Sequence, residues 1–144
     1  MRYCACLPLV LLTLGCGGRG AGEPKAPFDT SPVEGKVAFK EGKGRVNRLE
    51  RGKVWFKSKS DPKVEAVGTI DGEGAFTMST LTSERAWPGV PPGQYKVRLE
   101  VPLDDDREAQ TNIVQAKYLD YDKSGITVTV PVPNDFTIMV ERPR

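Results

Sequence analysis

The chain has 144 residues, which is enough for one domain with a core of its own. Its formal net charge is only +2 and both signs are interspersed, so nothing indicates the basic surface that nucleic-acid-binding proteins use. It has no histidine, which removes the usual general base and the commonest transition-metal ligand. We therefore expect no cofactor and no nucleic-acid partner.

The first sixteen residues indicate export. Arg2 supplies a short positive region, and Leu7–Leu14 is an apolar stretch far below the roughly 20 residues needed to span a bilayer. The run Leu12-Thr13-Leu14-Gly15-Cys16 resembles the lipobox of bacterial lipoproteins. That resemblance implies cleavage just before Cys16 and a lipid attached to its thiol. The alternative is an ordinary secretory signal that is cut within residues 15–22.

All three cysteines lie in this leader region, and the body of the chain beyond Cys16 has none. We therefore expect neither disulfides nor zinc or thiol chemistry in the folded part. Residues 17–32 are rich in glycine and proline and predict a flexible tether. The predicted organisation is a signal peptide over 1–15, a lipidated cysteine and tether over 16–32, and one domain over 33–144.

Short runs of alternating apolar and polar residues follow one another through this domain, and no useful helical periodicity occurs after the leader. Long irregular segments are expected at 41–51 and 102–122, and the Pro and Gly density of Ser79–Gly93 argues against a strand there. About seven strands favour an all-β fold, a single antiparallel β-sandwich of transthyretin-like or immunoglobulin-like type. The predicted strands cover 33–40, 52–57, 64–70, 75–78, 95–101, 125–130 and 136–141.

The segment Thr69–Met78 is central to this pattern. It enters an acidic, glycine-containing turn as one strand and leaves it as another, with Phe76 facing the core. Gly72 and Gly74 can supply positive-φ positions. We expect a hairpin or a tight corner of the sandwich here. Further on, Pro91-Pro92-Gly93 stiffens the approach to Tyr95, whose hydroxyl can reach the backbone at a sandwich edge.

The order of these segments resembles that of a known family, the small exported lipoproteins of planctomycete bacteria with a carboxypeptidase-regulatory-like, transthyretin-like domain. The resemblance spans Val33–Val140. It implies a β-sandwich and a location in the cell envelope, and it carries over no catalytic residue. The segments that carry it are Val33-x-Gly35-x-Val37, Gly68–Phe76, Val90–Val97, Gln115–Tyr118 and Ser124–Val130.

Three aromatic residues are candidates for stacking against a ligand: Trp55, Trp87 and Tyr118. Their grouping on one exposed face would favour a carbohydrate- or peptide-binding module, and their burial would rule it out. A simpler explanation of Trp55 is an aromatic residue that packs on the sheet or covers its edge.

Acidic residues suggest two further possibilities. Asp104-Asp105-Asp106 has the oxygen ligands that calcium prefers, but it lacks the spacing of a calcium loop, and the acids of the Asp71-Gly72-Glu73 turn are better explained by the turn. We therefore expect no metal site. A hydrolase would need two converging carboxylates, and no particular pair is indicated.

The sequence thus favours a noncatalytic, lipid-anchored protein of the cell envelope with a binding or structural role. Its domain is expected to face the periplasm or the exterior, anchored to the cell membrane or the outer membrane through Cys16. The expected partners, besides the membrane, are an envelope protein or a glycan. The alternatives are the extracytoplasmic carbohydrate- or peptide-binding module and, less favoured, a hydrolase.

Overall fold

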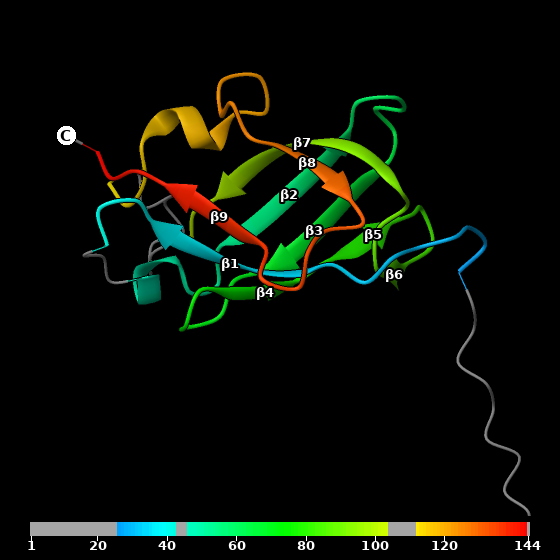
Figure 1. Ribbon diagram of the computed structural model, residues 1–144, viewed down its shortest axis with the longest axis horizontal. Coiled ribbons are helices and arrows are strands. Elements are labelled where there is room, and N and C mark those ends of the chain that lie inside the picture. The colour runs from blue at the N-terminus through cyan, green and yellow to red at the C-terminus, as the bar shows by residue number, and fades with distance from the viewer. Residues whose placement is uncertain (1–25, 43–45, 104–111, 144) are drawn as a thin grey trace, which may run out of the picture.

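The computed structural model describes residues 26–42, 46–103 and 112–143. It has two β-sheets that pack as a sandwich, as the sequence predicted (Figure 1). The smaller sheet has the strand order β4 (Ala75–Thr77), β1 (Glu34–Phe39) and β9 (Thr137–Val140). The larger sheet has the order β6 (Ala86–Pro88), β5 (Ser79–Leu81), β3 (Glu65–Thr69), β2 (Lys53–Ser58), β7 (Gly93–Glu100) and β8 (Thr127–Val130).

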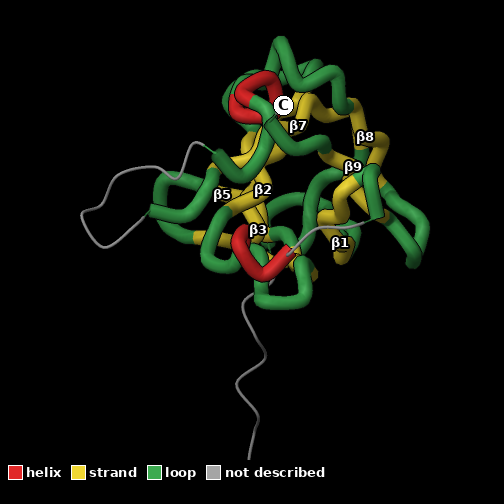
Figure 2. The backbone as a smooth tube through the Cα atoms, turned by 90° about the vertical axis from the view of Figure 1, so that its left-hand side faces the viewer, coloured by secondary structure: helices red, strands yellow, loops and turns green. Residues whose placement is uncertain are grey.

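The two sheets are most easily separated in Figure 2, where β1 and β9 lie to one side of β2, β3 and β5. Two short 3₁₀ helices, η1 (Val46–Leu49) and η2 (Ala116–Leu119), complete the described elements. None of the helices in the described part of the chain is long and apolar enough to cross a membrane.

The alternation of side chains builds the core between the sheets. On β7, Tyr95, Val97 and Leu99 point inward and are almost fully buried, as their alternation predicted. On β2, Val54 and Phe56 do the same, while the residues between them face outward. Phe56 contacts the ring of Tyr95 at a centroid distance of 5.9 Å, so the two strands share one aromatic cluster in the core.

The acidic turn after β3 is a corner and not a hairpin, because β3 and β4 belong to different sheets. The Asp71 side chain closes it: its Oδ1 accepts the backbone N–H groups of Glu73 at 2.9 Å and Ala75 at 2.8 Å. Of the two glycines, only Gly74 has a positive φ, at 83°. A Cβ there would lie 2.4 Å from Val46 Cγ1, so the corner also packs against η1.

The segment Ser79–Gly93 contains two strands, so the prediction that it would not join a ladder was wrong. Thr80 pairs with Trp87 and Leu81 with Ala86. The pairing is tolerated because β6 is the outermost strand of its sheet and Pro88 stands at its end, where a missing N–H does not interrupt a ladder.

Other connections also differ from the expected pattern. The irregular segment 41–51 contains η1, which buries Leu49 completely. The strands β8 and β9, adjacent in sequence, lie in different sheets, and β9 instead pairs with β1 in parallel, Val37 opposite Ile138. This one parallel pair brings the first and last strands of the domain together.

The chain joins the fold before β1. Ser31 and Val90 form an isolated antiparallel bridge, with Ser31 N–H donating to Val90 O at 2.8 Å and Val90 N–H donating to Ser31 O at 2.9 Å. The described segment ahead of β1 therefore lies along the end of the larger sheet that carries β5 and β6 (Figure 1).

Candidate functional site

The three aromatic candidates do not form one site. Tyr118 lies on η2 and is only 2% exposed, so the expectation that its ring faces solvent was wrong. The sequence could not predict this burial because the segment that contains η2 has no alternation or helical period. Nothing in it indicates which side chains point toward the core. A buried tyrosine at this position packs the end of the core and offers no ring face to a ligand.

The two tryptophans lie on opposite faces of the larger sheet. Strand pairing places Trp87 of β6 in one row with three residues of the neighbouring strands, which are Thr80 of β5, Ala66 of β3 and Phe56 of β2. These three residues are buried on the inner face of the sheet, so Trp87 is on that face too. Trp55 occupies the alternate position on β2 and therefore faces outward. Both tryptophans are half-buried. Trp87 stacks against Arg85, whose Cζ lies 3.5 Å from the ring centroid.

Trp55 lies within a small group on the outer face of β2 and β7, which we call the Trp55 face: Trp55, Arg98, Glu100 and Tyr121. Arg98 is directly opposite Trp55 in the β2–β7 register, and its Cζ lies 5.1 Å from the Trp55 ring centroid and 5.2 Å from that of Tyr121. The guanidinium thus contacts both rings, which hold it against the sheet.

Carboxylates and amines surround this group and pair with one another. Glu100 accepts the Trp55 indole N–H at 2.9 Å and the Lys53 ammonium at 3.3 Å. Lys57 lies 5.5 Å from the Tyr121 ring centroid and 3.8 Å from Glu65. Cations and anions alternate here, so the charges of the Trp55 face are paired. The face therefore presents apolar ring surface and has no concentrated electrostatic field of one sign.

Tyr121 is the member of this face that sequence reasoning missed. It is half-buried, burial raises the pKa of its hydroxyl, and that oxygen has no hydrogen-bond partner among the described residues. Only the loop that returns from η2 brings it beside β2 and β7, and no spacing in the sequence predicts this contact.

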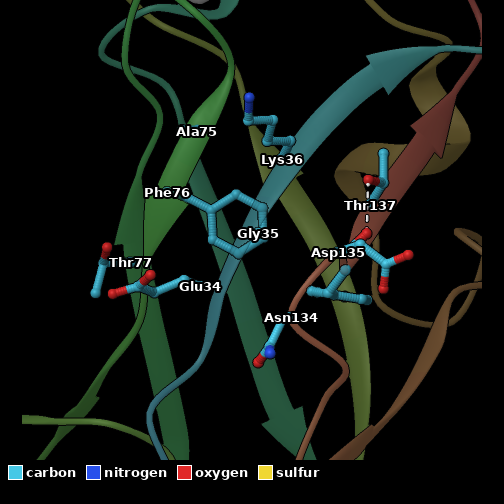
Figure 3. A pocket seen from close by; sticks show the side chains of 10 residues that line it. Glu34, Gly35, Lys36, Ala75, Phe76, Thr77, Asn134, Asp135 and Thr137 are labelled. Atoms are coloured by element: carbon cyan, nitrogen blue, oxygen red, sulfur yellow. Dashed lines mark hydrogen bonds between the residues drawn. The ribbon is translucent and has the colours of Figure 1, made fainter.

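A second feature is a pocket of about 430 Å³ at the smaller sheet (Figure 3). Gly35 on β1 lies at its centre, with the Phe76 ring beside it, and Lys36 points away. A Cβ at Gly35 would lie 2.7 Å from Phe136 Cδ1 and 2.8 Å from Phe76 Cζ, so the two rings occupy the space that a side chain would fill. They meet edge to face, with centroids 6.2 Å apart. These contacts explain why a glycine stands at this position of β1.

The acidic possibilities find no support in the described residues. No group of three potential metal ligands occurs among them, and Asp104-Asp105-Asp106 lies outside them. A hydrolase would be favoured by a cleft with two carboxylates of raised pKa. Two carboxyl groups in the described part have a clearly shifted pKa, those of Asp122 and Glu141. In both, hydrogen bonds from lysines lower the pKa.

The described geometry is therefore that of an all-β sandwich whose outer face carries a tryptophan, an arginine and a tyrosine in contact. The sequence matches no known protein-family model, no curated protein and no solved structure.

Proposed function

We propose that this protein is a noncatalytic, lipid-anchored component of the cell envelope with a binding or structural role. The observation that carries the proposal is the run ending at Cys16, followed by a Gly- and Pro-rich stretch that leads into a β-sandwich. The strand pairing that opens the fold begins at Ser31, which leaves a spacer between the anchor and the domain. A planctomycete-type lipoprotein with a carboxypeptidase-regulatory-like domain would have this organisation.

The test is the intact mass of the protein purified from its native membrane, beside a Cys16→Ser variant. We expect two or three acyl chains on a chain that begins at Cys16, and we expect the variant to lose both the acyl mass and the membrane attachment. A soluble, unmodified product cut elsewhere would contradict the anchor and leave an ordinary secreted protein.

A second candidate function, an extracytoplasmic carbohydrate- or peptide-binding module, is favoured by the contact between Arg98 and the rings of Trp55 and Tyr121. Ring surfaces held in place on a rigid sheet suit stacking against sugars or peptide side chains. Purified peptidoglycan, which contains both, is the probe. We expect it to sediment the wild-type domain and Trp87→Ala, and to sediment Trp55→Ala poorly. Equal sedimentation of both variants would contradict a role for this face.

A further inference from the structure

We infer that the anchored domain rests on the membrane surface through the edge formed by β5 and β6, with Trp87 at the level of the lipid headgroups. The inference builds on the proposed lipid anchor at Cys16. It concerns how the domain is oriented once the anchor holds it, and it rests on the position of the first bridge, the length of the spacer and the chemistry of that edge.

The first step is where the chain enters the fold. The paired hydrogen bonds between Ser31 and Val90 fasten the incoming chain beside β6, because Val90 follows Trp87 by only three residues. The approach is close: a Cβ on Gly89 would lie 2.8 Å from Ser31 O. Figure 1 shows the described chain beginning at the same end of the sandwich as β5 and β6.

The second step is reach. Fourteen residues lie between Cys16 and Ser31, and the chain from one to the other spans at most about 50 Å when fully extended. Glycine-rich chains of this length average about 20 Å from end to end. An anchor on Cys16 therefore keeps the Ser31 end of the domain nearer to the bilayer than the opposite end, where η2 lies.

The third step is the surface found at that end. Trp87 is half-buried, so part of its ring remains accessible, and Ala86 and Pro88 beside it are exposed. Trp is the side chain most suited to the boundary between headgroups and acyl chains, since its ring is apolar and its N–H is polar. The Arg85 guanidinium stacks on this ring, with its Cζ 3.5 Å from the ring centroid.

Charge does not dominate this edge, because the acidic Glu84 precedes Arg85. We therefore expect the contact to depend mainly on Trp87 and only weakly on salt or on anionic lipid. Trp55 faces outward from the middle of the larger sheet, away from this edge, and serves as an internal reference.

The chain has only two tryptophans, so each can be observed alone. Trp55→Phe leaves Trp87 as the only reporter, and Trp87→Phe leaves Trp55. Each lipidated variant is placed in phosphatidylcholine vesicles with and without bromine atoms on the upper acyl carbons, which quench tryptophan on contact. We expect the emission of Trp87 to shift to the blue and to be quenched, and the emission of Trp55 to stay unchanged.

A second arm separates the inference from the anchor. The chain from Cys16 onward has a single cysteine, which can be coupled to a maleimide-headgroup lipid in the same vesicles. This coupling attaches the chain to the vesicle through Cys16, whether or not the cell attaches a lipid there. Absence of native lipid together with quenching of Trp87 in coupled vesicles would overturn the proposed anchor and support the orientation.

Quenching of neither tryptophan in coupled vesicles, or of Trp55 in place of Trp87, would overturn the orientation even if the native anchor is confirmed. Should Trp55→Phe fail to fold, ¹⁹F NMR of the wild-type chain labelled with 5-fluorotryptophan resolves both residues. A paramagnetic lipid should then broaden the Trp87 signal, assigned with Trp87→Phe, and leave that of Trp55 sharp.

Discussion

The Tyr95 hydroxyl donates a 2.8 Å hydrogen bond to the backbone carbonyl of Pro91, four residues earlier in the chain. The sequence predicted that this hydroxyl could reach the backbone at a sandwich edge, and the bond confirms it. The ring is buried against Phe56, so one side chain fixes both the core and the turn that leads into β7.

Removal of this hydroxyl should be measurable. We expect Tyr95→Phe to lower the free energy of unfolding by about 1–2 kcal/mol, because the Pro91 carbonyl loses its partner in a part-buried site. Urea denaturation followed by circular dichroism measures the change. Tyr121→Phe is the matched control: its hydroxyl has no partner within the described structure, so we expect a change of less than about 0.5 kcal/mol. Equal losses would show that the hydrogen bond is not the cause.

The corner at Gly74 should tolerate no side chain. With φ at 83° and Val46 Cγ1 only 2.4 Å from the position of a Cβ, Gly74→Ala combines backbone strain with a steric clash. We expect a loss of about 3 kcal/mol or more in the free energy of unfolding. Gly42 has a similar φ of 61°, and among the described residues, its chain neighbours apart, no atom lies within 4 Å of an added Cβ, so we expect Gly42→Ala to lose about 1 kcal/mol. Similar losses in the two variants would show that packing against η1 contributes nothing.

The Asp71 side chain should stabilise the same corner by accepting hydrogen bonds from the backbone N–H groups of Glu73 and Ala75. Asp71→Ala leaves two backbone N–H groups without their acceptor, and we expect a loss of about 1–2 kcal/mol, moderated because the turn is exposed. Asp71→Asn retains the acceptor oxygen and should recover most of the stability. Thermal unfolding of the three proteins at one pH tests this, and a loss in the Asn variant as large as in the Ala variant would point to charge as the cause.

Glu141 should give the protein a specific response to acid. Hydrogen bonds from Lys40 at 2.7 Å and Lys117 at 3.0 Å hold the pKa of Glu141 at about 2. Since this pKa is lowered in the folded state, its stabilising contribution is fully present above the unfolded pKa near 4.5 and is lost as the pH falls towards 2. The difference in unfolding midpoint between wild type and Glu141→Gln should therefore be constant above about pH 5, shrink steadily below it and be largely lost by pH 2.

The carboxyl resonance of Glu141 checks the cause independently. We expect its pKa to rise in both Lys40→Met and Lys117→Met, because each lysine donates a hydrogen bond that lowers it. An unchanged pKa in both variants would mean that the ion pairs seen in the structure do not persist in solution.

Much of the fold could be predicted because alternation is a local signal. On β7, three inward residues in strict alternation define a strand whatever surrounds them. The strands β5 and β6 escaped prediction because the Pro and Gly density of their segment argued against a ladder, whereas Pro88 and Gly89 are tolerated at a sheet edge.

The site was harder to predict because it depends on register and on returning loops. The sequence placed Trp55 on a strand and Trp87 in a connection, and only the pairing of Thr80 with Trp87 shows that the two lie on opposite faces of one sheet. The contact of Tyr121 with Arg98 joins residues from a loop and a strand, and no local pattern encodes it. Prediction of a site therefore fails where the residues meet only through long-range pairing.

The parallel pair of β1 and β9 has a consequence for biosynthesis. Among the described strands, β1, the central strand of the smaller sheet, is made first and its parallel neighbour β9 is made last, so this sheet cannot close until β9 has been synthesised. Until then β1 has an open edge that can pair with other chains. A domain built this way gains from remaining unfolded until β9 has been made, because the pairing of β9 with β1 completes the smaller sheet.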